Sequence, residues 1–292
     1  MSQRLAHLNP WPLHLSREGR PPLPEGHTLH RLAHAIQSEF AGYRPEVTSP
    51  QGRFADGAAL LSGQLVLRAE AHGKHLFTWF DHDLVWHVHL GLIGKFDLLT
   101  AGSPGRGGVP RARIAAAETV GELRGPQTCR VITPAEVAEV MAGLGPDPLR
   151  DDADPTLAWE RIHKSSRPLA ALLMDQSVLS GIGNVYRAEV LFRNRLDPFR
   201  PGKGVKRRSW NAIWSDLAEL MPIGVETGRI DTVRDEHSPD EMGRPPRVDE
   251  HGGEVYVYRR AGDQCHVCGS RIRTRLLEGR NLFWCGKCQR RS

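Results

Sequence analysis

Four of the five cysteines lie near the C-terminus, in two pairs with the spacing of metal ligands. Sixteen residues separate Cys265-x2-Cys268 from Cys285-x2-Cys288. The two cysteines of a Cys-x2-Cys pair can bind the same ion through a tight turn. Four thiolates from two such pairs favour one tetrahedral Zn²⁺ with no coordination position left open for catalysis. The spacing therefore predicts one structural zinc ion. Two disulfides or four free thiols are the alternative, and a chain without a secretion signal does not favour disulfides.

The segment between the cysteine pairs has the length of a β-hairpin, with residues 278–281 near its tip. Residues 265–292 hold seven Lys and Arg and a single acid, Glu278, whereas the whole chain has a net charge of +5. A basic run is often only a solvated face. Here it is combined with a metal motif and the aromatic pair Phe283-Trp284, which favours nucleic acid as the partner. Cys129 lies outside the motif and is expected to be a small buried residue.

A glycine-rich motif, Gly181-Ile-Gly183-Asn184, precedes a helical pattern. Glycine lets the backbone approach a ligand closely. Asn184 is expected to be the N-cap of the helix that follows, and free N–H groups at a helix start attract phosphate. A plain helical hairpin without a ligand is the alternative.

The elements that must position these residues differ between the two halves of the chain. Spacings of three and four predict an amphipathic helix from about residue 24, with Leu29, Leu32, Ile36 and Phe40 on its apolar face. Residues 44–133 are rich in strand-forming residues, with runs at 64–71, 74–81 and 84–99. A tight turn at Gly73-Lys74 joins two of the runs, which favours an antiparallel sandwich or barrel. Residues 101–111 are expected to form a loop.

The second half of the chain is predicted to be helical. Patterns at 159–165, 169–175, 185–195 and 210–221 predict helices, residues 176–183 a double turn, and 228–254 a loop. We expect an α+β protein with five parts: an extension at 1–23, a sandwich domain at 24–143, a linker at 144–158, a helical domain at 159–255, and a zinc hairpin at 256–290. A chain of 292 residues is long enough for two domains.

The composition excludes several classes of protein. Hydrophobic residues make up 39% of the chain and charged residues 25%, which is typical of a globular protein rather than a disordered one. The sequence holds no run of about 18 apolar residues, so we expect no membrane span. Residues 1–23 contain four prolines and lack the apolar centre of a secretory signal.

The combined motifs resemble the bacterial formamidopyrimidine-DNA glycosylase/endonuclease VIII family of base-excision repair, most closely its actinobacterial endonuclease VIII-like members. The matching segments are PEGHTLH at 24–30, GKHLF at 73–77, MDQSVLSGIGNVYRAEVLF at 174–192, VYRRAGDQC at 257–265 and GRNLFWCGKCQ at 279–289. The resemblance implies a β-sandwich behind an N-terminal helix, then a helix–two turns–helix domain and a zinc hairpin. It also implies that damaged double-stranded DNA lies between the domains, with the damaged nucleotide flipped out.

By this resemblance the chain is a bifunctional glycosylase and abasic-site lyase that acts on oxidised bases. Pro24 is the nucleophile that forms an iminium with the sugar, and Glu25 is the general acid–base. Lys74 contacts DNA and assists elimination, and Arg280 grips a phosphate beside the lesion and assists β,δ-elimination. Asn184 binds phosphate. The resemblance also assigns Leu92 and Arg124 to the void left by the flipped base.

The mechanism conflicts with the position of Pro24, because an amide nitrogen has no lone pair for nucleophilic attack. We expect translation to start at position 23, where a non-standard codon for Leu23 is read as Met and the Met is then removed. Otherwise the chain is a non-catalytic damaged-DNA-binding protein with a blocked proline. A zinc-ribbon transcription factor is a third interpretation, which explains only residues 265–292. We further expect a cytoplasmic, nucleoid-associated monomer with no membrane partner; the preferred lesion stays open.

Overall fold

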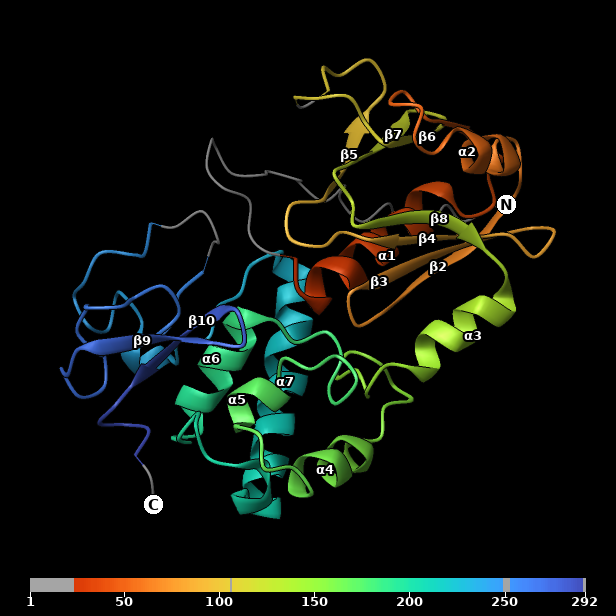
Figure 1. The fold of residues 1–292 in the computed structure, drawn as a ribbon. Helices are drawn as coiled ribbons and strands as arrows, with labels where there is room; N and C mark the ends of the chain where they lie inside the picture. Colours follow the sequence, from red (N-terminus) through yellow and green to blue (C-terminus); the bar gives the residue numbers. More distant parts are fainter. Residues whose placement is uncertain (1–23, 106, 249–252, 291–292) are drawn as a thin grey trace, which may run out of the picture.

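The computed structural model describes residues 24–105, 107–248 and 253–290, so the expectation for residues 1–23 lies outside the described residues. These residues form two lobes (Figure 1). One lobe contains the β-sheets, and the other contains most of the helices and the C-terminal hairpin. Within the described ranges, no helix is long and apolar enough to cross a bilayer.

The first lobe is a sandwich of two four-stranded antiparallel sheets, as the strand patterns predict. The strands of one sheet, in spatial order, are β1 (Glu46–Thr48), β6 (Ala112–Ala116), β7 (Thr119–Arg124) and β5 (Lys95–Thr100). Those of the other are β2 (Val66–His72), β3 (His75–Phe80), β4 (Val85–His89) and β8 (Thr128–Ile132). The run at 84–99 divides into β4 and β5. Gly91, with φ +70°, begins the turn by which the chain changes sheets.

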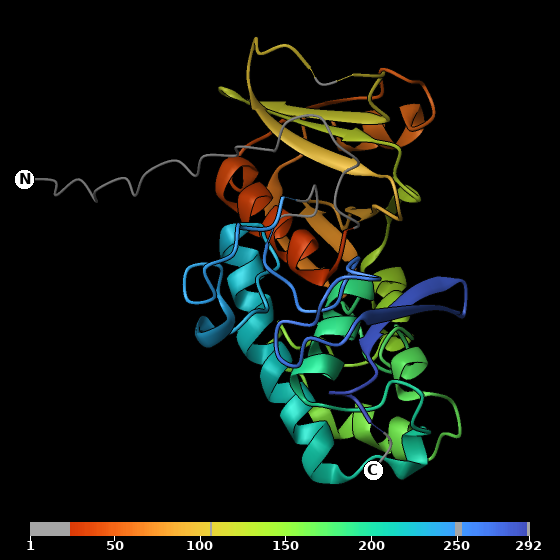
Figure 2. The same cartoon turned by 90° about the vertical axis from the view of Figure 1, so that its left-hand side faces the viewer.

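Helix α1 (Gly26–Phe40) lies at the junction of the two lobes (Figure 2). Leu29, Ile36 and Phe40 are fully buried in the sandwich core, and Leu32 is partly buried, as the periodicity predicts. The helix contacts β2 and β3 in its own lobe and α7 (Arg207–Thr227) in the other. Its packing therefore holds the preceding residues, Pro24 and Glu25, at the boundary between the lobes.

The second lobe contains the predicted helices with altered ends. Its elements are α4 (Pro155–His163), α5 (Leu169–Leu172), α6 (Asn184–Arg193), η1 (Gly202–Gly204), α7, η2 (Asp235–His237), and the hairpin of β9 (Ile272–Leu277) and β10 (Arg280–Cys285). Helix α7 continues past Pro222 and ends at Thr227, and its C-cap Gly228 has a left-handed φ of +72° that suits glycine. The short helices α2 (Ala55–Leu61) and α3 (Pro134–Ala142) were not predicted, because their apolar residues cover too few turns.

The predicted linker at 144–158 is in part a structural element. Helix α4 begins inside it, with the Asp154 side chain as N-cap, and Asp147 is 1% exposed. The Asp147 carboxylate accepts hydrogen bonds from His30 Nε2 at 2.8 Å, Gly73 N at 2.7 Å and Leu149 N at 3.0 Å. Because a carboxylate can only accept, the His30 ring nitrogen that faces it must carry a proton. Asp147 therefore ties α1 and the β2–β3 turn to the segment that connects the lobes.

Replacing Asp147 with alanine should lower the free energy of unfolding by about 2–4 kcal/mol, because the change leaves the Gly73 amide and His30 buried without an acceptor. Urea unfolding measures the loss. Asp151→Ala removes an exposed carboxylate four residues away and should change stability by less than about 0.5 kcal/mol. Equal losses in the two variants would contradict a structural role for Asp147.

Candidate active site and metal centre

The carboxylate of Glu25 caps the N-terminus of helix α6. It accepts hydrogen bonds from the backbone amides of Gly183 at 3.0 Å, Val185 at 2.8 Å and Tyr186 at 3.3 Å. The prediction that Asn184 is the N-cap is wrong: Asn184 is the first helical residue, and Gly183 is the N-cap without a side-chain bond of its own. A negative charge at this position also interacts favourably with the helix dipole. The cap of α6 thus comes from a residue about 160 positions earlier in the chain.

The two glycines of the GxGN motif make room for the segment around Glu25. A Cβ atom on Gly183 would lie 2.3 Å from Cδ of Glu25. The amide of Gly26 donates to the Gly181 carbonyl at 2.7 Å. The close approach that the glycines predict is therefore made by the chain itself. The amides of Gly183, Val185 and Tyr186 are occupied by Glu25, which corrects the expectation that this helix start offers them to a phosphate.

Lys74 reaches the same helix start from the other lobe. The predicted turn at Gly73-Lys74 is confirmed, since β2 ends at His72 and β3 begins at His75. The ammonium group donates to the Ile182 carbonyl at 2.7 Å. Burial lowers the pKa of Lys74 to about 8, against the attraction of Glu25. Burial raises the pKa of Glu25, against the effects of Lys74 and the three amide donors. A lysine and the carboxyl group of the residue after Pro24 thus meet at the start of α6, both with pKa values moved toward neutrality.

Asn184 is held by two residues that the sequence did not single out. The Arg187 guanidinium donates to Oδ1 of Asn184, and Nδ2 of Asn184 donates to the Asn281 carbonyl at 3.0 Å. A guanidinium has only donors, so the oxygen of the Asn184 amide must face Arg187. One hydrogen of the amide NH₂ group is then left for a ligand. In sequence Arg187 is one cation in an amphipathic helix, and its 1% exposure appears only in the folded chain.

Arg280 begins strand β10 directly after the hairpin turn and is partly exposed. Within the described residues, no hydrogen bond or ion pair of its guanidinium is recorded. Its positive charge contributes to the lowered pKa values of Lys74 and Arg187. Three cationic side chains from the sandwich, helix α6 and the hairpin therefore act on one region, which favours an anionic ligand.

The two residues assigned to void filling lie in different surroundings. Leu92 is 50% exposed in the turn after β4, and its neighbour Ile93 is 76% exposed. Arg124 ends β7, where its guanidinium pairs with Asp97 at 3.3 Å and with Glu122. Leu92 is therefore free to contact a ligand, whereas Arg124 is bound to two carboxylates of its own sheet. Both assignments stay predictions.

The four C-terminal cysteines form one cluster. Their sulfur atoms lie within 4.8 Å of one another, with 3.9 Å between Cys265 and Cys288 and 3.5 Å between Cys268 and Cys285. Tetrahedral Zn²⁺ with bonds of about 2.3 Å places its sulfur ligands about 3.8 Å apart, so the cluster fits one such ion. The hairpin predicted between the two cysteine pairs is confirmed. Cys129 lies outside the cluster and is only partly buried, and its sulfur accepts a hydrogen bond from Trp86.

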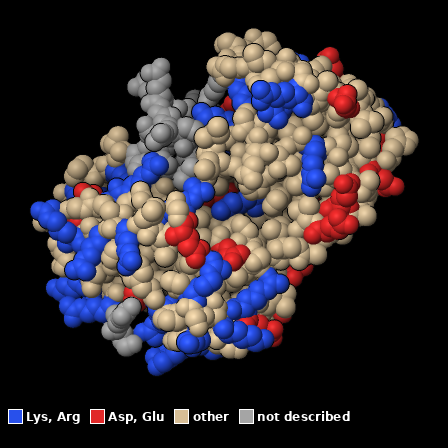
Figure 3. All heavy atoms as spheres, viewed as in Figure 1, with Lys and Arg blue, Asp and Glu red and all other residues tan. Residues whose placement is uncertain are grey.

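Positive charge gathers around the hairpin. Figure 3 shows Lys and Arg side chains over the part of the molecule that contains β9 and β10. Arg271, Arg273 and Arg275 contribute exposed side chains there. This distribution agrees with the charge pattern of the sequence, and it places the basic surface beside Arg280.

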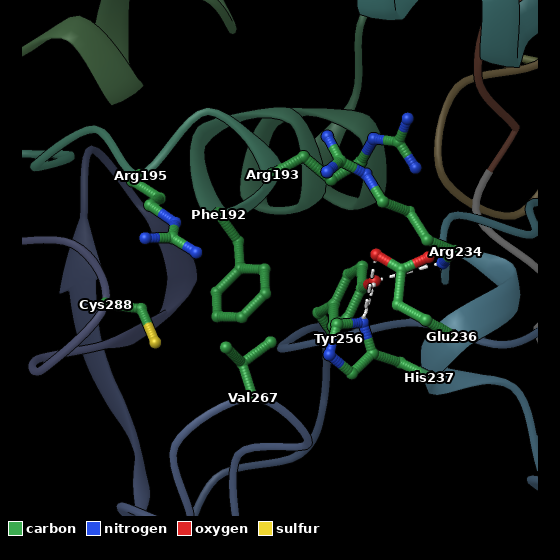
Figure 4. Close-up of a pocket in the computed structure, with 9 residues that line it drawn as sticks. All are labelled: Phe192, Arg193, Arg195, Arg234, Glu236, His237, Tyr256, Val267 and Cys288. Atoms are coloured by element: carbon green, nitrogen blue, oxygen red, sulfur yellow. Dashed lines mark hydrogen bonds and ion pairs between the residues drawn. The ribbon is translucent and has the colours of Figure 1, made fainter. Parts of the chain in front are cut away.

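A small pocket borders the cysteine cluster at Cys288 (Figure 4). Its lining also includes Phe192, Tyr256 and Val267. Arg193 also lines it, but its guanidinium is bound to Asp216 and to the Thr232 carbonyl. Apart from Cys288, the lining of this pocket contains no predicted site residue, and the start of α6 is the candidate active site.

Comparison with known proteins identifies the family. The formamidopyrimidine-DNA glycosylase N-terminal domain matches residues 23–130, and the H2TH domain of the same glycosylase matches residues 144–235. Endonuclease 8 1 of Mycobacterium tuberculosis H37Rv is 52% identical over 271 residues, which cover 91% of this chain and 100% of that protein. The chain belongs to the formamidopyrimidine-DNA glycosylase/endonuclease VIII family. It is therefore a DNA glycosylase of base-excision repair with a C-terminal zinc-finger motif.

More distant members of the glycosylase family support this assignment. Formamidopyrimidine-DNA glycosylase of Thermus thermophilus is 29% identical over 281 residues, covering 92% of this chain and 93% of that protein. The structure of Lactococcus lactis Fpg in complex with DNA that contains an abasic site has a TM-score of 0.74 and 21% identity. The matched region covers 91% of this chain and 100% of the Lactococcus lactis chain, so the fold is shared over nearly all of this chain.

Replacing Cys268 with serine should weaken DNA binding at least tenfold, because a lost thiolate ligand loosens the hairpin that carries Arg280. The sandwich should stay folded, since its core is separate from the hairpin. Metal analysis and DNA titration measure the effect. Cys129→Ser, outside the cluster, is the control and should keep its metal. Unchanged affinity of the Cys268 variant would contradict a metal-supported hairpin.

The affinity for DNA should fall as the pH rises above about 8, because Lys74 loses its charge there. A phosphate beside Lys74 favours the charged form, so binding above pH 8 requires uptake of a proton. The Kd should then rise by up to about tenfold per pH unit. Titration of an uncleavable abasic-analogue duplex from pH 7 to 9.5 tests this. Lys74→Arg keeps its charge and should remove this part of the pH dependence; identical profiles would exclude Lys74 as the titrating group.

Proposed function

We propose that the protein is a bifunctional DNA glycosylase and abasic-site lyase that removes oxidised bases through an iminium at Pro24. The observation that carries the proposal is the convergence of Lys74 and Glu25, the residue that follows Pro24, at the start of α6. A nucleophile, an acid–base group and a cation at one place are what covalent glycosidic cleavage and elimination require.

In the proposed mechanism, the Pro24 amine attacks C1′ of the damaged nucleoside, and the bond from C1′ to the base breaks. Opening of the sugar then gives the iminium, with the ring oxygen taking a proton. Glu25 would donate that proton, since burial raises the pKa of its carboxyl group and so favours the protonated acid. The carboxyl group is fixed by its three amide donors, so it needs no reorientation during the reaction.

The proposed elimination steps use the cations around the site. The Glu25 carboxylate formed in the preceding step takes a proton from C2′, and the C3′–O bond breaks to release the 3′ phosphate. A second elimination removes the C4′ proton to a base and breaks the C5′–O bond, which releases the 5′ phosphate. Lys74 and Arg280 stabilise the phosphates that leave, and the free NH₂ hydrogen of Asn184 binds a phosphate beside the lesion. Leu92 enters the space of the flipped base, and Arg124 contributes to that space if DNA displaces its carboxylate partners.

The proposal extends to the metal and the partners. Zn²⁺ is the expected ion, since four thiolates match its preference and leave no open position. When bound it supplies no chemistry and fixes the hairpin instead. The partner is double-stranded DNA with a damaged base or an abasic site. We further propose that the protein acts as a cytoplasmic, nucleoid-associated monomer.

The state of the Pro24 nitrogen decides between two functions. With residues 1–23 attached, Pro24 is an amide, and the alternative is a non-catalytic protein that binds damaged DNA. The family match begins at residue 23, which supports a functional chain whose first residue is Pro24. An initiator methionine at position 23 would be removed before the small proline.

A chain that begins at Pro24 should form a covalent adduct with abasic DNA on borohydride reduction, because its terminal amine is nucleophilic near neutral pH. The 292-residue chain should form none. Intact mass spectrometry verifies both N-termini and the adduct site. Glu25→Gln in the shorter chain should form adducts more slowly from base-containing substrates. Adduct formation by a chain that retains residues 1–23 would falsify the role of Pro24.

A further inference from the structure

The turn of the zinc hairpin carries an acid two residues before the proposed phosphate-binding arginine. Glu278 and Gly279 form this turn with φ values of +45° and +74°, and Arg280 follows. Glu278 is the only acidic residue between 265 and 292. A carboxylate two residues from Arg280 repels a phosphate, so its presence at the tip needs a physical explanation.

Arg167 binds this carboxylate from the helical lobe. Its Nη2 and Nε atoms lie 2.9 Å and 3.4 Å from the two carboxylate oxygens of Glu278, and its Nη1 donates to Asp175 at 2.7 Å. Asp175 in turn accepts from the amide and the hydroxyl of Ser177 in the double turn. One guanidinium therefore connects the hairpin turn to the start of the double turn that leads to α6.

The main chain at Arg167 is itself anchored. Its carbonyl accepts a hydrogen bond from the Gly202 amide at 3.0 Å, and its amide donates to the Ser165 side chain at 3.1 Å. The guanidinium thus reaches the hairpin from a fixed point, which makes it suited to hold the turn in one position. A planar guanidinium also fixes direction better than a lysine ammonium group.

We propose that Arg167 is a positioning residue for Arg280: it clamps the hairpin turn to the double turn and neutralises Glu278 where DNA phosphate must bind. The inference rests on the proposed function, because it takes the anion at Arg280 to be a DNA phosphate. Arg167 itself touches neither the phosphate nor the reacting sugar.

Electrostatics agree with this arrangement. The charge of Glu278 acts on the buried Arg187, as does that of Arg280, so Glu278 lies within reach of the same cationic region.

Because the Arg167 and Glu278 side chains are 43% and 50% exposed, solvent screens the pair. Losing the clamp should therefore weaken DNA binding only about twofold to fivefold.

A double-mutant cycle tests the clamp. Binding of a duplex with a tetrahydrofuran abasic analogue is measured for the wild type, Arg167→Gln, Glu278→Gln and the double variant. Arg167→Gln should weaken DNA binding by about twofold to fivefold, because the Glu278 carboxylate then repels the phosphate without a neutralising partner. In the Glu278→Gln background the same change should have no effect. Arg161→Gln removes another exposed arginine of this lobe and provides the control for the loss of one positive charge.

Two results would overturn the inference. An equal loss in both backgrounds, with the salt slope reduced by about one, means that Arg167 contacts a phosphate directly. A loss no larger than that of Arg161→Gln means that it has no positioning role.

Hydrogen exchange on the free protein separates the clamp from the proposed function. Arg167→Gln should reduce amide protection at residues 277–281 at least threefold, and unchanged protection contradicts the clamp. The two tests are independent of each other. If the chain that begins at Pro24 forms no borohydride adduct, the proposed function is wrong. If amide protection nevertheless falls in Arg167→Gln, the clamp is still supported.

Discussion

The contact between the Glu25 carboxylate and the N-terminus of α6 is the constraint on which the site depends. One buried acid takes three backbone amides, so the residue after Pro24 is fixed against the helical lobe to within hydrogen-bond geometry. These three hydrogen bonds set a structural requirement in each lobe. They need a glycine at position 183, because any side chain there would overlap the carboxylate. They also need α1 to be anchored in the sandwich, since α1 determines where the residue before it lies.

The other inter-lobe contacts gather around this one. Lys74 binds the Ile182 carbonyl, Gly26 binds the Gly181 carbonyl, and Asp147 holds the turn that carries Lys74. Together these polar contacts bring the sandwich and the double turn together at one point. Asn184 and Arg187 extend the arrangement to the hairpin through the Asn281 carbonyl. A DNA glycosylase must hold a sugar and its flanking phosphates at the same time, and the groups that we propose for these two tasks come from three separate segments.

The buried groups near Pro24 and the arginines of the hairpin suit different tasks. Groups near Pro24 are buried, and their pKa values move toward neutrality, which suits proton transfer. Arg271, Arg273 and Arg275 of the hairpin are exposed and Arg280 is partly exposed, so these side chains are open to a phosphate from solvent. The acid at the hairpin turn, on an otherwise basic surface, is explained by its partner Arg167. The cysteine cluster lies at the base of the hairpin and the Arg167–Glu278 ion pair lies at its tip, so the hairpin has contacts at both ends.

Much of this protein follows from local sequence. The cysteine spacing, the Gly73-Lys74 turn, the apolar face of α1 and the strand runs each depend on short-range patterns, and the structure confirms them. The family resemblance rests on equally local motifs. The capping of α6 by Glu25, the buried position of Asp147 in the predicted linker, and the contacts of Arg187 and Arg167 could not be predicted correctly. Each of these depends on a partner many residues away, and sequence spacing does not encode which distant group will occupy a buried amide or carboxylate. Short-range patterns therefore specify the elements and the chemistry that they carry, whereas the pairing of buried charges with their donors is settled only when distant segments pack together.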